Sequence, residues 1–192
     1  MARRIEKDAV RMKVLMQCAA SKDANAGRLR TKSGDEVLFV ADPALCTSIP
    51  GARYSTPDDL CGDDGSTWRN ELKRYNEQSE NPCKFLRAAE LYTPKENDFR
   101  KLYRDLANAF GWDNFFILSA GWGLIRANFR TPDYNVTFSM QAKKKKPWAW
   151  RNTEDKRHTW ADFNHLQDAN RGGGADPLLR GKGLSADILR AR

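Results

Sequence analysis

Three apolar stretches of the chain predict β-strands. Residues 14–17 (VLMQ) are short and apolar with a β-branched residue at the start, and residues 36–40 (EVLFV) have a similar composition. The third stretch, FFIL at 115–118, is the strongest strand signal. An apolar run of this density is typical of a strand that is covered on both faces. We expect residues 14–17 and 115–118 to be interior strands of one sheet.

Two segments show the periodicity of an amphipathic helix. The first begins at Ser66-Thr67, after which apolar residues recur at 68, 72 and 75. The second, residues 97–111, is the clearest helix, and Gly111 supplies its end. Its apolar stripe consists of Phe99, Leu102, Tyr103, Leu106 and Phe110. Between the two helices, residues 84–92 have an apolar face that does not distinguish a helix from a strand.

The remaining segments predict loops and weaker elements. Residues 41–66 are rich in Pro, Gly and Asp and are predicted to form an exposed loop excursion. A turn at 131–133 precedes a short strand predicted at 135–138, and residues 153–167 predict a last helix. Residues 168–192 contain no aromatic residue and no sustained period, which is typical of a flexible extension.

The order of strand, helix and strand favours an α/β fold. We expect a single layered domain with a mainly parallel sheet over residues 1–167, followed by the tail 168–192. An α/β domain would carry a further strand after the last helix, and the tail predicts none. We therefore expect this C-terminal segment to be flexible or altered.

Positive charge is concentrated in the last quarter of the chain. The net charge is +8, and residues 143–192 hold 12 Lys/Arg against 6 Asp/Glu, a net +6. This distribution favours a polyanionic partner, nucleic acid above all, but a solvated basic tail explains it equally well. No apolar run reaches the roughly 18–20 residues that cross a bilayer, and the basic N-terminus leads straight into a strand. We expect a cytoplasmic protein with no membrane partner.

The cysteines and histidines do not predict a metal site. The four cysteines contain no CxxC pair, so we expect reduced thiols. A zinc site made of Cys46, Cys61 and Cys83 would lack the closely spaced ligand pairs that zinc sites usually have. His158 and His165 lie two helical turns apart without a carboxylate at the right spacing, and we interpret them as surface residues. We expect no metal and no cofactor.

Two of the predicted strands end in residues that can bind or react. The first leads into CAASK at 18–22, and the third leads into SAGWG at 119–123. In open α/β sheets, ligands bind beyond the carboxyl ends of the strands. If these strands are neighbours, Ser21, Lys22 and Ser119 line one crevice. Each residue also has a structural interpretation: the cysteine as a small buried side chain, the serine as a turn cap, the lysine as a solvated loop residue.

Five short motifs occur in an order that resembles a known family. They are CAASK at 18–22, ELYT at 90–93, NDFRKLYRDLA at 97–107, ILSAGWGLI at 117–125 and PDYNVTF at 132–138. Their order and spacing are similar to those of the YaaA peroxide-stress family of bacterial and phage proteins. More distantly, they resemble the catalytic core of archaeosine synthase, whose strand-end cysteine and lysine motif acts on a modified guanine. The resemblance covers about residues 12–140.

The resemblance and the strand ends together imply a site built from separate parts of the chain. The implied catalytic residues are Cys18, Ser21, Lys22, Tyr92 and Asp133. The implied ligand-binding residues are Ser119, Gly121, Gly123, Tyr134 and Thr137. Two positions depart from the family pattern. Ala19 stands where a serine is usual, and Asn135 stands where an aspartate is usual, with an aspartate ahead of the tyrosine instead.

The segment KKKKPWAWR at 143–151 combines positive charge with aromatic side chains. Lysines can follow a phosphate backbone while tryptophans stack on bases, so we expect nucleic-acid contact here. In the alternative interpretation the tryptophans pack under the sheet and the lysines are solvated. The residues of the predicted contact are Lys143, Lys144, Lys145, Lys146, Trp148 and Trp150.

Three classes of function fit these observations. The first is an enzyme that acts on a nucleobase or nucleoside in DNA or RNA, with DNA the preferred partner, by cleaving or exchanging an N-glycosidic bond or modifying a base. The second is a nucleic-acid-binding stress or phage protein without turnover, and the third is a sensor of a small nucleotide. The chemical role of Lys22 distinguishes the enzyme from the two kinds of binder. In a binder its ammonium pairs with a phosphate, whereas in an enzyme a desolvated amine is a nucleophile.

Overall fold

The computed structural model describes residues 12–94, 101–137 and 147–149. The elements, in chain order, are β1 (Val14–Gln17), β2 (Glu36–Phe39), the 3-10 helix η1 (Pro43–Leu45), β3 (Ala52–Ser55), α1 (Trp68–Glu77), β4 (Leu86–Arg87), α2 (Ala88–Leu91), α3 (Leu102–Phe110), β5 (Phe115–Ser119), β6 (Gly123–Arg126) and β7 (Arg130–Thr131). The presence of helices and paired strands confirms an α/β composition. The predicted helix 153–167 and tail 168–192 lie outside the described residues.

The central sheet has the strand order β1-β5-β6. β1 runs parallel to β5, while β6 runs antiparallel to β5. Two smaller pairs complete the set, β2 with β3 in parallel and β4 with β7 antiparallel. The expectation of a mainly parallel sheet is therefore wrong. The physical reason is the short connection 120–122 between β5 and β6, which is long enough for a hairpin but too short for a parallel crossover.

β5 lies in the interior of the sheet, as its apolar density predicts, with Phe115 and Ile117 fully buried. β1 differs from the prediction. Within the part of the chain that the structure describes, it pairs with β5 alone, and Leu15 is 59% exposed. Its alternating burial is that of an edge strand with one face on the core. The sequence of four residues is too short to show this alternation clearly.

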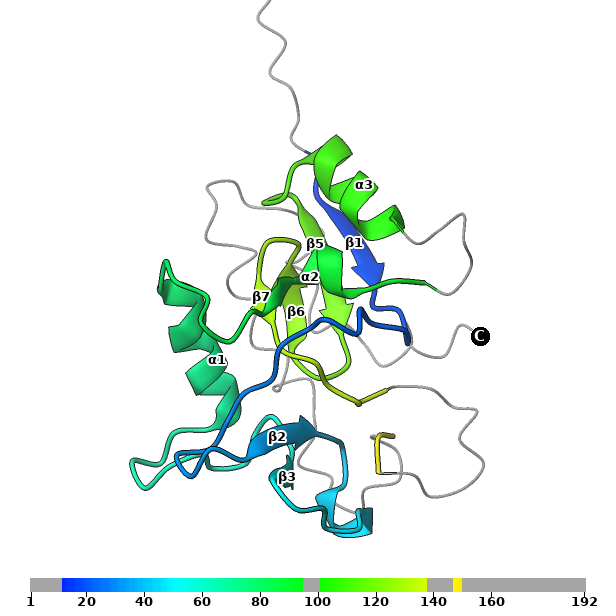
Figure 1. Cartoon of the computed structure of the whole chain (residues 1–192). Coiled ribbons are helices and arrows are strands. Elements are labelled where there is room, and N and C mark those ends of the chain that lie inside the picture. The colour runs from blue at the N-terminus through cyan, green and yellow to red at the C-terminus, as the bar shows by residue number, and fades with distance from the viewer. Residues whose placement is uncertain (1–11, 95–100, 138–146, 150–192) are drawn as a thin grey trace, which may run out of the picture.

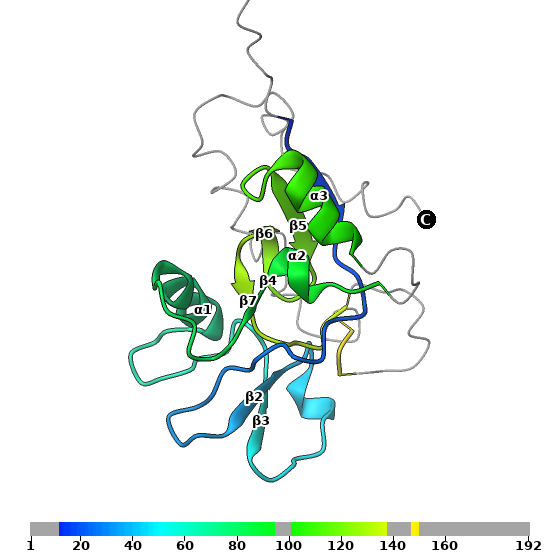
Figure 2. The same ribbon diagram turned by 45° about the horizontal axis from the view of Figure 1, so that its top comes forward.

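The helices pack on the sheet through aromatic side chains. In both views of the ribbon, α2 and α3 lie over the β1–β5 pair at one end of the molecule, with β2 and β3 at the other (Figures 1 and 2). The ring of Tyr103 on α3 lies 6.2 Å from that of Phe115, and its hydroxyl donates to the carbonyl of Gln17 at 2.7 Å. Gly111 ends α3 with a φ of 93°, as expected, while residues 97–100 are outside the described part.

α1 follows its sequence signals closely. The Thr67 side chain accepts a hydrogen bond from the backbone N–H of Asn70 at 3.3 Å, which satisfies one of the free donors at the helix start. Trp68, Leu72 and Tyr75 form the buried face, as the periodicity predicts. The ring of Phe39 on β2 lies 6.0 Å from that of Trp68 and 4.9 Å from that of Trp122. Phe39 thus joins the β2–β3 pair to the core.

Three weaker predictions have different outcomes. Residues 84–92 form both kinds of element, β4 followed by α2. The segment 41–66 is not only an exposed excursion, since it contains η1 and β3, and Ser55 within it is fully buried. The strand predicted at 135–138 does not form over 135–136; Thr137 makes a single bridge with Ala149, and residue 138 is outside the described part.

Over the ranges that the structure describes, no helix has the length and apolar character needed to span a membrane.

An asparagine side chain connects α1 to β7. The Asn76 Oδ1 accepts from the backbone N–H of Arg130 at 2.7 Å, and Asn76 Nδ2 donates to the carbonyl of the same residue at 2.9 Å. This amide therefore pairs with residue 130 as a neighbouring strand would. Removing it leaves two backbone groups of a partly buried residue without a partner.

We predict that Asn76→Ala lowers the free energy of unfolding by about 1–3 kcal/mol, the cost of leaving partly buried polar groups unpaired. The measurement is urea-induced unfolding followed by circular dichroism. Asn70→Ala is the matched control, because Asn70 is an exposed residue of the same helix. Equal losses in the two variants would contradict the role of the Asn76 amide.

Candidate functional site

The two strand ends singled out from the sequence lie side by side. In the parallel β1–β5 pair, Gln17 is opposite Leu118, and the backbone N–H of Cys18 donates to the carbonyl of Leu118 at 3.0 Å. Cys18 and Ser119 therefore lie at the same end of the strand pair, which confirms that the two strands are neighbours. Lys22 follows four residues after Cys18, in the loop beyond the end of β1.

A short backbone pairing brings Tyr92 to the same place. Lys22 and Tyr92 form an antiparallel bridge, flanked by a hydrogen bond from Asp23 N–H to the Leu91 carbonyl at 2.8 Å and from Thr93 N–H to the Ser21 carbonyl at 3.2 Å. α2 ends at Leu91, so Tyr92 is the first extended residue after a helix. The loop 21–23 is held by main-chain contacts, which restrict where the Lys22 side chain can go.

Three buried hydroxyl groups form a continuous chain of hydrogen bonds. The hydroxyl oxygens of Tyr92 and Tyr134 are 2.7 Å apart, and that of Tyr134 lies 2.9 Å from Ser119 Oγ. Ser119 Oγ also accepts from the backbone N–H of Trp122 at 3.1 Å. Each hydroxyl can donate in either direction along this chain, so a proton can be passed between Tyr92 and Ser119 through Tyr134.

The amine of Lys22 lies over the face of the Tyr134 ring, with Nζ 4.1 Å from the ring centroid. This is a cation–π contact, which stabilises an ammonium that has lost part of its water. Burial lowers the pKa of Lys22 below its usual value of 10.5, while the nearby Cys18 and Asp133 act in the opposite direction. The lysine therefore loses its proton more readily than an exposed lysine, as a reactive amine must.

The tyrosines around this amine remain protonated at neutral pH. Burial raises the pKa of both Tyr92 and Tyr134 well above the ordinary value of 10. Burial likewise raises the pKa of Tyr103 to about 12. The hydroxyl chain therefore supplies hydrogen-bond donors and acceptors, not a phenolate.

The residues that meet here are called the Lys22 site. They are Cys18, Ser21, Lys22, Tyr92, Ser119, Asp133 and Tyr134. Tyr92, Ser119 and Tyr134 are buried, whereas Cys18, Ser21, Lys22 and Asp133 are half-buried. Of this set, the four half-buried residues are the ones that solvent reaches.

Two glycines of the predicted binding set have structural reasons for being glycine. A Cβ at Gly121 would lie 2.8 Å from Cδ2 of the Tyr134 ring, closer than real Cβ contacts come. Gly123 has a φ of 78°, which favours glycine, at the start of β6. Gly121 thus provides the surface on which the Tyr134 ring rests, and contact of either glycine with a ligand stays a prediction.

An arginine that the sequence did not single out holds the turn that contains Gly121. Nη2 of Arg69 donates to the Gly121 carbonyl at 3.2 Å, while Nε and Nη2 pair with the two carboxylate oxygens of Asp58 at 2.7 and 3.1 Å. This bidentate pair orients the guanidinium toward the turn. No local pattern in the sequence predicts it, because Arg69 and Gly121 lie 52 positions apart.

The other predicted residues lie elsewhere. Thr137 pairs through its backbone with the segment 147–149, where its N–H donates to the Trp148 carbonyl at 2.7 Å. Trp148 is half-buried. The predicted nucleic-acid contacts Lys143, Lys144, Lys145, Lys146 and Trp150 lie outside the described residues.

Among the residues that the structure describes, no group of three His, Cys, Asp or Glu side chains is placed to hold a metal ion. The four cysteines are free thiols and all half-buried.

No family model matches the chain, and neither a curated protein nor a solved structure matches it. The resemblance of the five motifs to the YaaA peroxide-stress family therefore stays an expectation, and the function has to be argued from the Lys22 site.

We predict that Gly121→Ala destabilises the protein by about 1–3 kcal/mol, because the added methyl group forces the Tyr134 ring to move. Urea-induced unfolding measures the loss. The control is Gly62→Ala, where the nearest atom to an added Cβ is an oxygen of the exposed Asp64 carboxylate at 3.3 Å, not a buried ring. If both variants were equally stable, the ring would not rest against Gly121 as described.

Proposed function

We propose that the chain is an enzyme that cleaves or exchanges the N-glycosidic bond of a nucleobase in a nucleic acid, with Lys22 as the attacking amine. The observation that carries the proposal is the position of the half-buried Lys22 amine over the Tyr134 ring, beyond the shared carboxyl end of β1 and β5. Burial there lowers the pKa of Lys22. A lowered pKa increases the share of neutral amine, which is the nucleophilic form, at a given pH. The net charge of +8 supports a polyanionic substrate, and DNA is the preferred one.

The proposed reaction uses groups that the Lys22 site brings together. The neutral amine forms a bond to C1′ of the sugar as the bond from C1′ to the base nitrogen breaks, and the electron pair leaves with the base. The new secondary ammonium passes a proton to the Asp133 carboxylate, from which the departing base is protonated. For cleavage, the nitrogen lone pair then expels the sugar ring oxygen from C1′, the ring oxygen takes up a proton from solvent, and an iminium between Nζ and the sugar remains until water hydrolyses it. For exchange, a second base reacts before the ring opens. Its nitrogen bonds to C1′ as the bond from C1′ to Nζ breaks, the amine leaves with the electron pair, and the proton of the incoming base passes to Nζ.

The Tyr134 ring contributes at each stage at which positive charge is present. It faces the amine at 4.1 Å, so it stabilises the secondary ammonium and the iminium as well as the resting ammonium. The carboxylate of Asp133 is half-buried, and in the proposed reaction it also stabilises the cationic sugar of the transition state. The buried hydroxyl chain fixes the position of the ring through Tyr92 and Ser119.

We predict that Lys22→Arg abolishes turnover while leaving nucleic-acid affinity within a few-fold. Arginine keeps the charge but cannot be deprotonated. The probes are labelled single- and double-stranded oligonucleotides that carry a modified guanine, including 7-substituted 7-deazaguanines. Two readouts are measured: release of the base, and covalent capture of the protein by borohydride, which reduces the iminium to a stable amine. Both should fall by about a hundredfold or more, the scale of losing a positioned catalytic group.

Lys73→Arg is the matched control, because Lys73 is an exposed lysine of α1 that does not belong to the Lys22 site. Full turnover in Lys22→Arg would show that Lys22 is not the nucleophile. A wild-type protein that binds the oligonucleotides but releases no base, with affinity that falls in Lys22→Arg, would instead identify a non-catalytic binder in which Lys22 holds a phosphate.

A further inference from the structure

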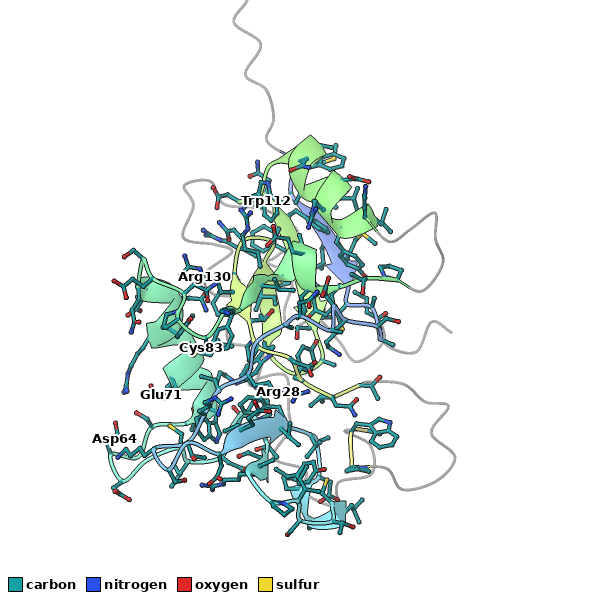
Figure 3. The ribbon with its side chains drawn as sticks, in the orientation of Figure 1. Arg28, Asp64, Glu71, Cys83, Trp112 and Arg130 are labelled. Carbon is teal, nitrogen blue, oxygen red and sulfur yellow. The ribbon has the colours of Figure 1, made fainter. Side chains whose placement is uncertain are left out.

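Arg28 lies between two carboxylates, one of which belongs to the Lys22 site. Its Nη1 donates to Glu36 Oε2 at 2.9 Å and its Nη2 donates to Asp133 Oδ2 at 3.3 Å. Glu36 in turn accepts from Arg30 at 2.9 Å through its other oxygen. Figure 3 shows Arg28 beside β2, at the boundary between the β2–β3 pair and the rest of the molecule. The guanidinium therefore connects β2 to the segment that carries Asp133 and Tyr134.

The main chain around Arg28 is held on both sides. The N–H of Asp133 donates to the Gly27 carbonyl at 2.9 Å, and the N–H of Val37 donates to the Leu29 carbonyl at 2.8 Å. Gly27 also packs so closely on the chain at Cys83 that a Cβ there would lie 1.7 Å from the Cys83 carbonyl oxygen. Main-chain hydrogen bonds thus hold the segment 27–29 between β2 and Asp133. The Arg28 guanidinium binds the carboxylates of Glu36 and Asp133 from a backbone of fixed position.

We propose that Arg28 is a positioning residue that competes with Lys22 for the carboxylate of Asp133 and so controls how readily the Lys22 amine loses its proton. Among the described titratable groups, Tyr134 lies under the Lys22 amine, and Tyr92 pairs with Lys22 through the main chain while its hydroxyl bonds to Tyr134. The charges of Cys18 and Asp133 also act on the amine. Of these, Asp133 is the one that Arg28 binds. The importance of this control for catalysis rests on the proposed function, but the control itself is a property of the resting protein.

The direction of the effect follows from electrostatics. A carboxylate near an ammonium favours the charged form, and Asp133 already raises the pKa of Lys22 against the effect of burial. Pairing with Arg28 draws the carboxylate toward the guanidinium. Without Arg28 the carboxylate is free to approach Nζ, so the pKa of Lys22 rises. Without Asp133 the pKa of Lys22 falls further.

The test is the pH profile of acetylation of Lys22 in the folded protein, without nucleic acid, quantified by peptide mass spectrometry. Only the neutral amine reacts, so the midpoint of the profile reports the protonation of Lys22. Arg28→Gln should move the midpoint upward and Asp133→Asn downward. A shift of about half a pKa unit changes the reactivity about threefold on the acidic side of the midpoint.

Two further variants separate positioning from a general charge effect. In Arg28→Gln/Asp133→Asn, the midpoint should stay near that of Asp133→Asn alone, because Arg28 acts through the carboxylate. Arg30→Gln, which removes the same charge and a bond to Glu36 but leaves the Asp133 contact, should not move it. Circular dichroism checks that each variant is folded; if Arg28→Gln is not, Arg28→Lys, which cannot form both bonds of the fork, replaces it.

An unchanged midpoint in the folded Arg28 variant, an equal shift in Arg30→Gln, or the same effect of Arg28→Gln with and without Asp133 would each overturn the proposal. The predicted shifts in a protein that releases no base would leave this control standing and contradict the proposed reaction instead.

Discussion

The position of the Tyr134 ring is the constraint on which the Lys22 site depends. One edge of the ring rests on Gly121, where a methyl group would come within 2.8 Å, and its hydroxyl bonds to both Tyr92 and Ser119. The ring is buried, with 3% of its residue surface exposed, so these contacts leave it little room to move. One face then remains for the Lys22 amine, 4.1 Å from the centroid. A tyrosine held in this way lets Lys22 be half-buried without a direct ion pair to any residue that the structure describes.

The Lys22 site is built from segments that lie far apart in the sequence and that the fold brings together. β1 and β5 supply the parallel pair whose ends carry Cys18 and Ser119, and the loop after β7 supplies Asp133 and Tyr134. β2 reaches the same region through Arg28 and through the Phe39 carbonyl, which accepts from Asn135 N–H at 2.8 Å. In the proposed control of Lys22, the β2–β3 pair contributes position and charge through these contacts and no group that reacts.

The sequence predicts the local features of this structure better than its long-range ones. The strands at 14–17 and 115–118 and the face of α1 follow from short apolar patterns, and the motifs place Lys22, Tyr92, Ser119 and Tyr134 in one site. The direction of β6, the edge position of β1 and the pairing of β3 depend on which strands meet, which no local pattern records. The sequence does not predict the roles of Arg28 and Arg69 for the same reason. Arg28 binds Asp133, 105 positions away, and Arg69 binds Gly121, 52 positions away.

The central claim, that the Lys22 amine lies desolvated over the Tyr134 ring, is tested most directly by nuclear magnetic resonance of the Lys22 side chain. The ε-methylene protons should be shifted upfield by the ring current, and they should titrate with a midpoint below the usual 10.5 of lysine. The upfield shift should disappear in Tyr134→Leu, whereas the midpoint should stay below 10.5, because leucine keeps the amine half-buried and removes the cation–π contact that favours the ammonium. A Lys22 resonance that coincides with those of the exposed lysines and titrates with them in the wild-type protein would contradict the account.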